Sequence, residues 1–129
     1  YLVTPLLANH AKDEKCFIYE IEKDGKRLLY GNDTGNFPDA TWAYLAGRAF
    51  DFVSLDCTML KYRDGSNHMG IEDVFEVRKR LECLGCAGRD TVFAVTHFSH
   101  NGQLLHDEIE KAVGPRGFLV AYDGMAVSF

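Results

Sequence analysis

Hydrophobic positions near the start of the chain fall into short runs separated by turn residues, a pattern typical of strands. Residues 1–7 form the first apolar run, and Pro5 inside it predicts an edge strand, because proline cannot donate to a hydrogen-bonded ladder. Residues 16–21 and 27–30 also have strand composition. Asp24-Gly25 between these two runs predicts a β-hairpin.

Further strands are predicted in the middle and at the end of the chain. Residues 52–57 form a short apolar run with a polar exit, and residues 91–96 form a near-continuous apolar run. The second run predicts a strand that is covered on both faces. The last apolar runs, 118–122 and 125–128, flank Asp123-Gly124 and predict a closing hairpin.

Three segments have apolar residues at helical spacing. One follows Pro38, a second spans 71–84 and ends at Gly85, and a third spans about 103–113 and ends before Pro115. In the second segment, acidic residues open the helix and basic residues follow, which the helix dipole favours. Strands that alternate with helices predict an α/β layered architecture, and no internal repeat interrupts it.

Composition narrows the class of protein. The 129 residues are 47% hydrophobic and 26% charged, as in a globular domain. Fourteen Lys and Arg against 19 Asp and Glu give a net charge of −5, which argues against a general binder of nucleic acid or anionic membrane. No apolar run approaches the roughly 20 residues of a membrane span, and four cysteines without a dense framework fit a reducing compartment. We therefore expect a cytoplasmic protein.

Candidate chemistry gathers where strands end. His10, Asp33, His68 and His97 each lie at or just after a strand end or in a polar loop. Imidazole and carboxylate groups suit zinc, manganese or iron, and rigid strands commonly hold such ligands on loops. The alternative stays open that Asp33 closes an Asx-turn and that the histidines are ordinary hydrogen-bonded loop residues.

The cysteines offer a weaker signal. Cys83 and Cys86 have the spacing of a redox or zinc-knuckle pair, but they lie at the end of a predicted helix and no second pair completes a zinc site. We interpret them as a structural helix terminus. Cys16 and Cys57 alternate with strand residues, so we expect both in the core.

Five segments along the chain combine candidate site residues with turn residues: Thr4–His10 (TPLLANH), Tyr30–Gly35 (YGNDTG), Asn67–Met69 (NHM), Thr96–Asn101 (THFSHN) and Ala121–Met125 (AYDGM). In this order they resemble the later motifs of the metallo-β-lactamase superfamily. The similarity covers essentially the whole chain and extends to the cyclic-phosphate phosphodiesterase of the carbon–phosphorus lyase pathway and, further off, to ribonuclease Z.

The resemblance implies a role for each candidate residue. His10 corresponds to a metal ligand, Asp33 to a carboxylate that bridges two metals, and His97 to a late ligand of the second metal. His68 corresponds to the histidine that stabilises the leaving oxygen or donates a proton to it. His100 corresponds to a position that helps to hold a separate structural zinc together with N-terminal cysteines, and those cysteines are absent from this chain.

One superfamily signature is missing. No His-x-His-x-Asp-His cluster occurs in the sequence. The resemblance therefore implies that residues 1–129 are the C-terminal half of an αββα sandwich, a mixed sheet with covering helices. Two histidines and one aspartate cannot complete a site of two metals about 3.5–4 Å apart. We expect the N-terminal half, or a second chain, to cover the open sheet and complete the site.

The implied activity is metal-dependent hydrolysis. Two divalent ions, zinc or manganese, would activate a hydroxide that attacks a small phosphodiester or an RNA-like substrate, and this chain alone would be inactive. Two alternatives stay open. One is a non-catalytic domain that dimerises through the uncovered sheet. The other is a two-His-one-carboxylate iron oxygenase, although the usual close His-x-Asp spacing is absent.

Overall fold

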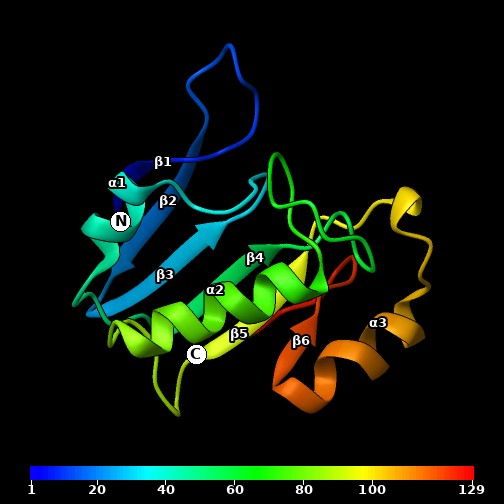
Figure 1. The fold of residues 1–129 in the computed structure, drawn as a ribbon. Helices are drawn as coiled ribbons and strands as arrows, with labels where there is room; N and C mark the ends of the chain where they lie inside the picture. The colour runs from blue at the N-terminus through cyan, green and yellow to red at the C-terminus, as the bar shows by residue number, and fades with distance from the viewer.

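The computed structural model describes residues 1–129 and contains one six-stranded mixed sheet (Figure 1). The strands lie side by side in the order in which they occur along the chain. They are β1 (Leu2–Leu7), β2 (Phe17–Lys23), β3 (Lys26–Gly31), β4 (Phe52–Asp56), β5 (Val92–Thr96) and β6 (Phe118–Val120).

The sheet changes from antiparallel to parallel at β3. Strands β1, β2 and β3 pair antiparallel, whereas β3, β4, β5 and β6 pair parallel. The predicted hairpin between β2 and β3 is confirmed, and Asp24 and Gly25 adopt φ of 51° and 79°, as a tight hairpin turn requires. Pro5 lies in the edge strand β1, where its missing N–H costs no ladder bond on the outer side.

Three α-helices follow the predicted segments: α1 (Asp39–Leu45), α2 (Ile71–Cys83) and α3 (His106–Val113). Two short 3₁₀ helices, η1 (His100–Gly102) and η2 (Gly114–Arg116), flank α3. Helix α2 lies across the parallel strands, and α3 packs beside β6 (Figure 1). None of these helices combines the length and the apolar composition that crossing a bilayer requires.

A single core joins the helices to one face of the sheet. The apolar stripe of α2 buries Val74, Val77 and Leu81 against strand residues such as Val53 and Phe93. Each buried side chain of this size stabilises the fold by roughly 1.5–3 kcal/mol. The α/β layered architecture with covering helices is therefore confirmed.

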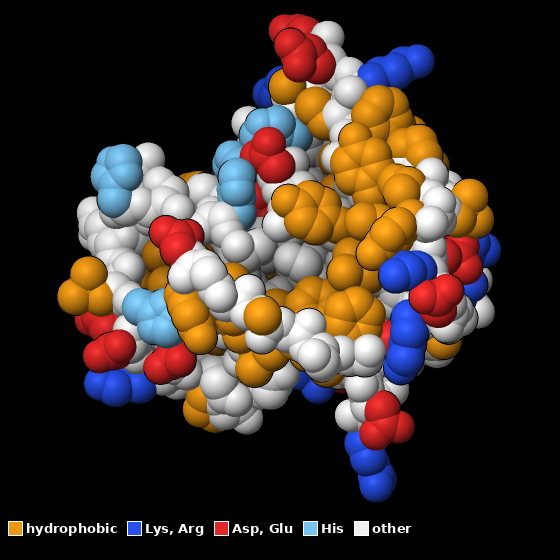
Figure 2. Space-filling view, turned by 180° about the vertical axis from the view of Figure 1, so that it is seen from behind, with side chains coloured by type: hydrophobic (Ala, Val, Ile, Leu, Met, Phe, Trp, Pro, Cys, Tyr) orange, Lys and Arg blue, Asp and Glu red, His pale blue; other side chains and the backbone are white.

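The opposite face of the sheet carries apolar side chains that remain open. Tyr19, Leu28 and Tyr30 alternate with buried residues, and Tyr19 and Tyr30 are 36% and 44% exposed. Viewed from this side, hydrophobic side chains gather over a broad area, with histidines beside it (Figure 2). A groove of about 460 Å³ runs over this face, between Leu28 and Tyr122 among other residues.

Two details of the C-terminal third differ from the sequence prediction. The prediction of a closing hairpin was wrong, because β6 pairs parallel with β5 and no second strand follows it. The residues after Val120 form a turn, in which Met125 N donates to Tyr122 O at 3.0 Å. Apolar residues of this segment, Met125 and Phe129, instead line the groove on the open face. Helix α3 begins at His106 rather than near residue 103, because Gln103 is held at φ 56°.

Candidate metal centre

The predicted site residues lie at one edge of the sheet. Strands β3, β4 and β5 are parallel, so their carboxyl ends meet there, and Asp33, Asp56 and His97 each lie at or directly after one of these ends. The loops after β1 and before α2 bring His10 and His68 to the same place. This edge is where open parallel sheets bind their ligands.

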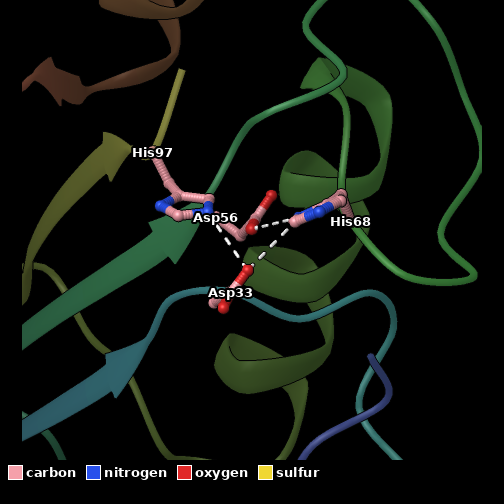
Figure 3. A group of neighbouring side chains, drawn as sticks. All are labelled: Asp33, Asp56, His68 and His97. Atoms are coloured by element: carbon pink, nitrogen blue, oxygen red, sulfur yellow. Dashed lines mark hydrogen bonds and ion pairs between the residues drawn. The ribbon is translucent and has the colours of Figure 1, made fainter. Parts of the chain in front are cut away.

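Two of these residues have an unusual backbone. Asp33 and His97 adopt φ of 55° and 64°, the left-handed region that residues with a Cβ rarely occupy. Such strain concentrates where a side chain must be aimed at a functional site. In both residues, the chain turns immediately after a strand and directs the polar side chain back across the sheet edge (Figure 3).

The carboxylate of Asp33 is the common neighbour of three imidazoles. Its Oδ1 lies 3.1 Å from His97 Nε2, 3.6 Å from His10 Nε2 and 3.8 Å from His68 Nδ1. The rings of His10 and His68 are 4.8 Å apart between centroids, and those of His68 and His97 are 5.6 Å apart. The cluster is partly open, since the Asp33 and His97 side chains are 54% and 45% exposed.

His10 is oriented by the loop that carries His68. Its Nδ1 lies 3.1 Å from the carbonyl oxygen of Asn67, which accepts a hydrogen bond from the Nδ1–H tautomer. That tautomer leaves the Nε2 lone pair of His10 free on the side of Asp33. A backbone carbonyl that fixes the tautomer in this way is the usual partner of a metal-ligating histidine.

Asp56 is the fully buried centre of the hydrogen-bonding network. Its Oδ2 lies 2.9 Å from His68 Nδ1 (Figure 3). The same oxygen accepts from Thr34 N at 3.3 Å. Its Oδ1 accepts from Thr58 N at 3.0 Å and Met69 N at 3.1 Å. One carboxylate therefore joins the loops after β3 and β4 to the loop before α2. Four partners satisfy a group that would otherwise be costly to bury.

The donor set fits a divalent cation. Oxygen and nitrogen atoms of Asp33, Asp56, His68 and His97 all lie within 4.8 Å of one another. Both oxygens of Asp56 and the Nδ1 of His68 are already hydrogen-bonded, which leaves Asp33 Oδ1 and His97 Nε2 as the uncommitted atoms of this group. His10 is not a member of the group, and its Nε2 lies 3.6 Å from Asp33 Oδ1. Ligands of a tetrahedral zinc ion are about 3.3 Å apart, close to the 3.1 Å and 3.6 Å that separate Asp33 from these histidines.

The structure brings together four of the five predicted site residues. His10, Asp33, His68 and His97 converge, whereas His100 opens η1 and is exposed outside this cluster. The sequence analysis missed Asp56, which it described only as the polar exit of a buried strand. The available signal was an acidic residue at the end of an apolar strand that is buried from Val53 onward.

The cysteines take no part in the cluster. Burial, together with the charge of Asp56 and Asp73, raises the pKa of the Cys57 thiol to about 12. Cys86 is also buried, and burial raises its pKa too; its Sγ donates to Leu45 O at 3.1 Å. Cys83 is exposed at the end of α2, so Cys83 and Cys86 form a helix terminus. Cys57 is in the core as predicted, and Cys16 is only partly buried.

A family model described as the beta-lactamase superfamily domain matches residues 2–98, which include His10, Asp33, Asp56, His68 and His97. The chain belongs to the metallo-β-lactamase superfamily. Its fold is similar to that of the metallo-beta-lactamase fold protein YhfI from Bacillus subtilis, with a TM-score of 0.66 and 20% identity over 95% of this chain and 48% of that one. No curated protein matches the chain.

A second solved structure shares the metallo-β-lactamase fold of this chain. The isothiocyanate hydrolase from Delia radicum gut bacteria is similar with a TM-score of 0.68 and 15% identity, over 98% of this chain and 53% of that one. The chain therefore spans about half the length of both solved structures.

Proposed function

We propose that the chain is the C-terminal half of a metal-dependent phosphodiester hydrolase whose metal centre is held by His10, Asp33 and His97. The observation that carries the proposal is the convergence of His10 Nε2 and His97 Nε2 on Asp33 Oδ1, at 3.6 Å and 3.1 Å, beside the Asp56–His68 pair. The substrate we favour is a small phosphodiester or an RNA-like one. Two divalent ions, zinc or manganese, are the cofactors that this donor set suits.

Bound divalent ions would lower the pKa of a coordinated water towards neutrality and withdraw negative charge from the phosphoryl oxygens. The residues of this chain then have separate tasks. His10 and His97 present Nε2 lone pairs, and Asp33 presents the carboxylate between them. Because Asp33 is more than half exposed, the centre can be reached from solvent.

His68 is the residue we propose as proton donor to the leaving oxygen. Its Nδ1 is held by Asp56 at 2.9 Å, which leaves Nε2 as the nitrogen that can face substrate. A donor must lie within hydrogen-bond reach of the leaving oxygen, and the contact with Asp56 fixes the ring so that Nε2 is the atom that would do so. Phosphodiesters need such a donor because the leaving alkoxide is a poor leaving group unless it is protonated.

The site as present in this chain offers three ligand groups, fewer than two metal ions need. We propose that the remaining ligands come from an N-terminal half outside residues 1–129, which would also cover the open sheet face. Two facts support this arrangement: the chain spans about half of the solved structures that share its fold, and the face opposite α2 carries exposed apolar side chains. We place the protein in the cytoplasm, since the exposed Cys83 thiol suits a reducing compartment.

Metal and rate measurements on single variants test the proposal. In the complete protein, Asp33→Ala should lose bound metal and hydrolysis of 2′,3′-cyclic AMP, whose leaving group is an alkoxide, together. His68→Ala should keep its metal and lose turnover by about 10²–10⁴-fold, the contribution of a positioned acid. His100→Ala serves as the matched histidine control and should keep the metal of this centre. Full metal content in Asp33→Ala would contradict the ligand role, and metal loss in His68→Ala would make His68 a ligand.

A second candidate function rests on the open face. An incomplete sandwich with Tyr19, Leu28 and Tyr30 uncovered could serve as a non-catalytic domain that dimerises through this face. Sedimentation analysis together with metal analysis separates the two functions. A dimer that binds no zinc or manganese supports the interaction domain. A chain that binds metal, or gains it when the N-terminal half is present, supports the hydrolase.

A further inference from the structure

Thr58 contacts two residues of the candidate centre, Asp56 and His97. It is the second residue after β4, and its backbone N–H donates to Asp56 Oδ1 at 3.0 Å. Its hydroxyl donates to the backbone carbonyl of His97 at 2.6 Å. A single residue thus contacts the carboxylate that orients His68 and the backbone of the proposed metal ligand His97.

The hydrogen bond from the Thr58 hydroxyl is made to a residue with a strained backbone, His97. His97 holds a φ of 64°, and the hydroxyl of Thr58 is the one donor to its carbonyl oxygen. The cost of the left-handed conformation for a residue with a Cβ is of the same order as the net contribution of one hydrogen bond. The hydrogen bond from the Thr58 hydroxyl therefore contributes enough free energy to decide which conformation His97 adopts.

The conformation of His97 decides where its imidazole points. Immediately before it, Thr96 is fixed in β5 and its carbonyl accepts from Cys57 N at 2.9 Å. If the φ of His97 returned to the extended region, the chain would continue in the direction of β5, and Nε2 could not remain 3.1 Å from Asp33 Oδ1. The left-handed turn is thus what brings this ligand to the centre.

We propose that Thr58 is a positioning residue whose hydroxyl holds His97 in the left-handed conformation that aims its imidazole at Asp33. The proposal rests on the proposed function for its consequence, since the aimed imidazole matters as a metal ligand. The conformational part stands on the geometry of Thr58 and His97 alone and can be tested without metal.

Three variants isolate the hydroxyl. Thr58→Val removes it and keeps the shape and the N–H that Asp56 uses, whereas Thr58→Ser restores it. Thr91→Val is the matched control, because the Thr91 hydroxyl also donates to a backbone carbonyl, that of Phe50 at 2.8 Å, in the loop before β5 at the opposite end of the sheet. All three can be compared with the unmodified complete protein in its metal-free form.

The first readout is the NMR signal of His97, because a positive φ gives a strong NOE between the amide proton and Hα of the same residue. We expect this NOE to weaken in Thr58→Val and to be present in Thr58→Ser and Thr91→Val. The second readout is zinc affinity by competition with a chromophoric chelator, which should fall about 10–100-fold in Thr58→Val alone.

An unchanged His97 NOE in a folded Thr58→Val chain would overturn the proposal. A loss that Thr58→Ser fails to restore would overturn it as well, because it would trace the effect to packing rather than to the hydroxyl. Should Thr58→Val itself fail to fold, Thr58→Ala takes its place, and an unchanged His97 NOE in the folded alanine variant contradicts the positioning role. If the unmodified complete protein binds no zinc, the proposed function fails and the NOE comparison is unaffected.

Discussion

The Nδ1 atom of His68 lies 2.9 Å from Oδ2 of Asp56, a carboxylate with no exposed surface. The two residues come from different elements, β4 and the loop before α2, and are joined at the sheet edge where β3 and β5 also end. The same carboxylate oxygen accepts from Thr34 N, next to Asp33. The orientation of His68 and the position of Asp33 therefore depend on one buried group.

Replacing Asp56 by Asn should reduce both stability and activity. The amide NH₂ can no longer accept, so at least one of the N–H donors now paired with the carboxylate is left unsatisfied. We expect a loss of about 1–3 kcal/mol in the free energy of unfolding. We expect turnover in the complete protein to fall about 10²–10⁴-fold, because His68 loses its orientation.

Urea unfolding and turnover of 2′,3′-cyclic AMP, which has an alkoxide leaving group, measure the two effects of Asp56→Asn. His68→Asn is the control that removes the acid and leaves the backbone donors of Thr34, Thr58 and Met69 paired with Asp56. An Asp56→Asn protein as stable as the unmodified chain would contradict the central place of this carboxylate.

Gly35→Ala should force apart two loops of the candidate centre. A Cβ at Gly35 would overlap the carbonyl oxygen of Gly65 and lie 2.7 Å from the carbonyl oxygen of Ser66. Backbone atoms cannot move aside as a flexible side chain can, so we expect a destabilisation of about 1–3 kcal/mol. At Gly88 a Cβ would meet nothing within 4 Å, and Gly88→Ala should change stability by less than about 0.5 kcal/mol. Equal unfolding midpoints for the two variants would refute the close approach of these loops.

The thiols should differ sharply in reactivity. The pKa of Cys57 is raised to about 12 by burial and by nearby carboxylates, whereas Cys83 is exposed. Since the thiolate is the nucleophile, iodoacetamide at pH 8 should label Cys83 first and Cys57 only after unfolding. Mass spectrometry of the labelled peptides measures the order. Labelling of Cys57 as fast as Cys83 in the folded protein would be inconsistent with this burial.

The raised pKa of Cys57 also predicts a dependence of stability on alkaline pH. The unfolded thiol ionises near its ordinary pKa of 9.0, while the folded thiol keeps its proton up to about 12. Stability from this group is therefore complete below pH 9 and is lost as the pH rises from 9 towards 12. Cys57→Ala should show a smaller decline than the unmodified chain in urea unfolding across this range. The same decline in both proteins would argue against the contribution.

Acid should weaken the opposite end of the sheet. The backbone N–H of Arg27, at 2.8 Å, and the Lys26 ammonium, at 2.9 Å, hold the pKa of Asp51 below its ordinary value of 3.8. The unfolded state thus binds this proton first, so stability from Asp51 is present above pH 3.8 and is lost as the pH falls through and below that value. Asp51→Asn should flatten the acid limb of a plot of unfolding free energy against pH. An unaltered acid limb would show that Asp51 contributes nothing there.

Much of the fold could be predicted because the local signals agree with the tertiary structure. The Asp24-Gly25 turn predicted the β2–β3 hairpin, and the apolar spacing of residues 71–84 predicted α2, whose last helical residue is Cys83. The same agreement failed after Val120, where the strand composition of 125–128 meets the open face instead of an antiparallel partner. Whether an apolar run pairs as a strand or packs on a sheet face depends on the rest of the sheet, and the residues of the run alone do not determine it.

The candidate centre was predictable to the extent that strand ends bear its chemistry. Asp33, His68 and His97 can be recognised in the sequence as polar residues beside turns. Their convergence follows once β3, β4 and β5 are parallel neighbours. Asp56 could not be assigned in this way, because its role consists of contacts with residues 34, 58, 68 and 69 that only the folded chain brings together. The positive φ of His97 is likewise set by a distant hydroxyl.

The parallel register of β4 between β3 and β5 has a consequence for how the proposed metal centre forms during folding. Asp56 pairs with Thr96, and the side chains of a strand alternate between its faces, so a slip of one residue would turn this carboxylate away from every one of its partners. An intermediate with β4 unpaired or misaligned should lack the proposed cation site. We therefore expect zinc added during refolding to bind only once this part of the sheet is complete, so that binding reports the assembly of the domain.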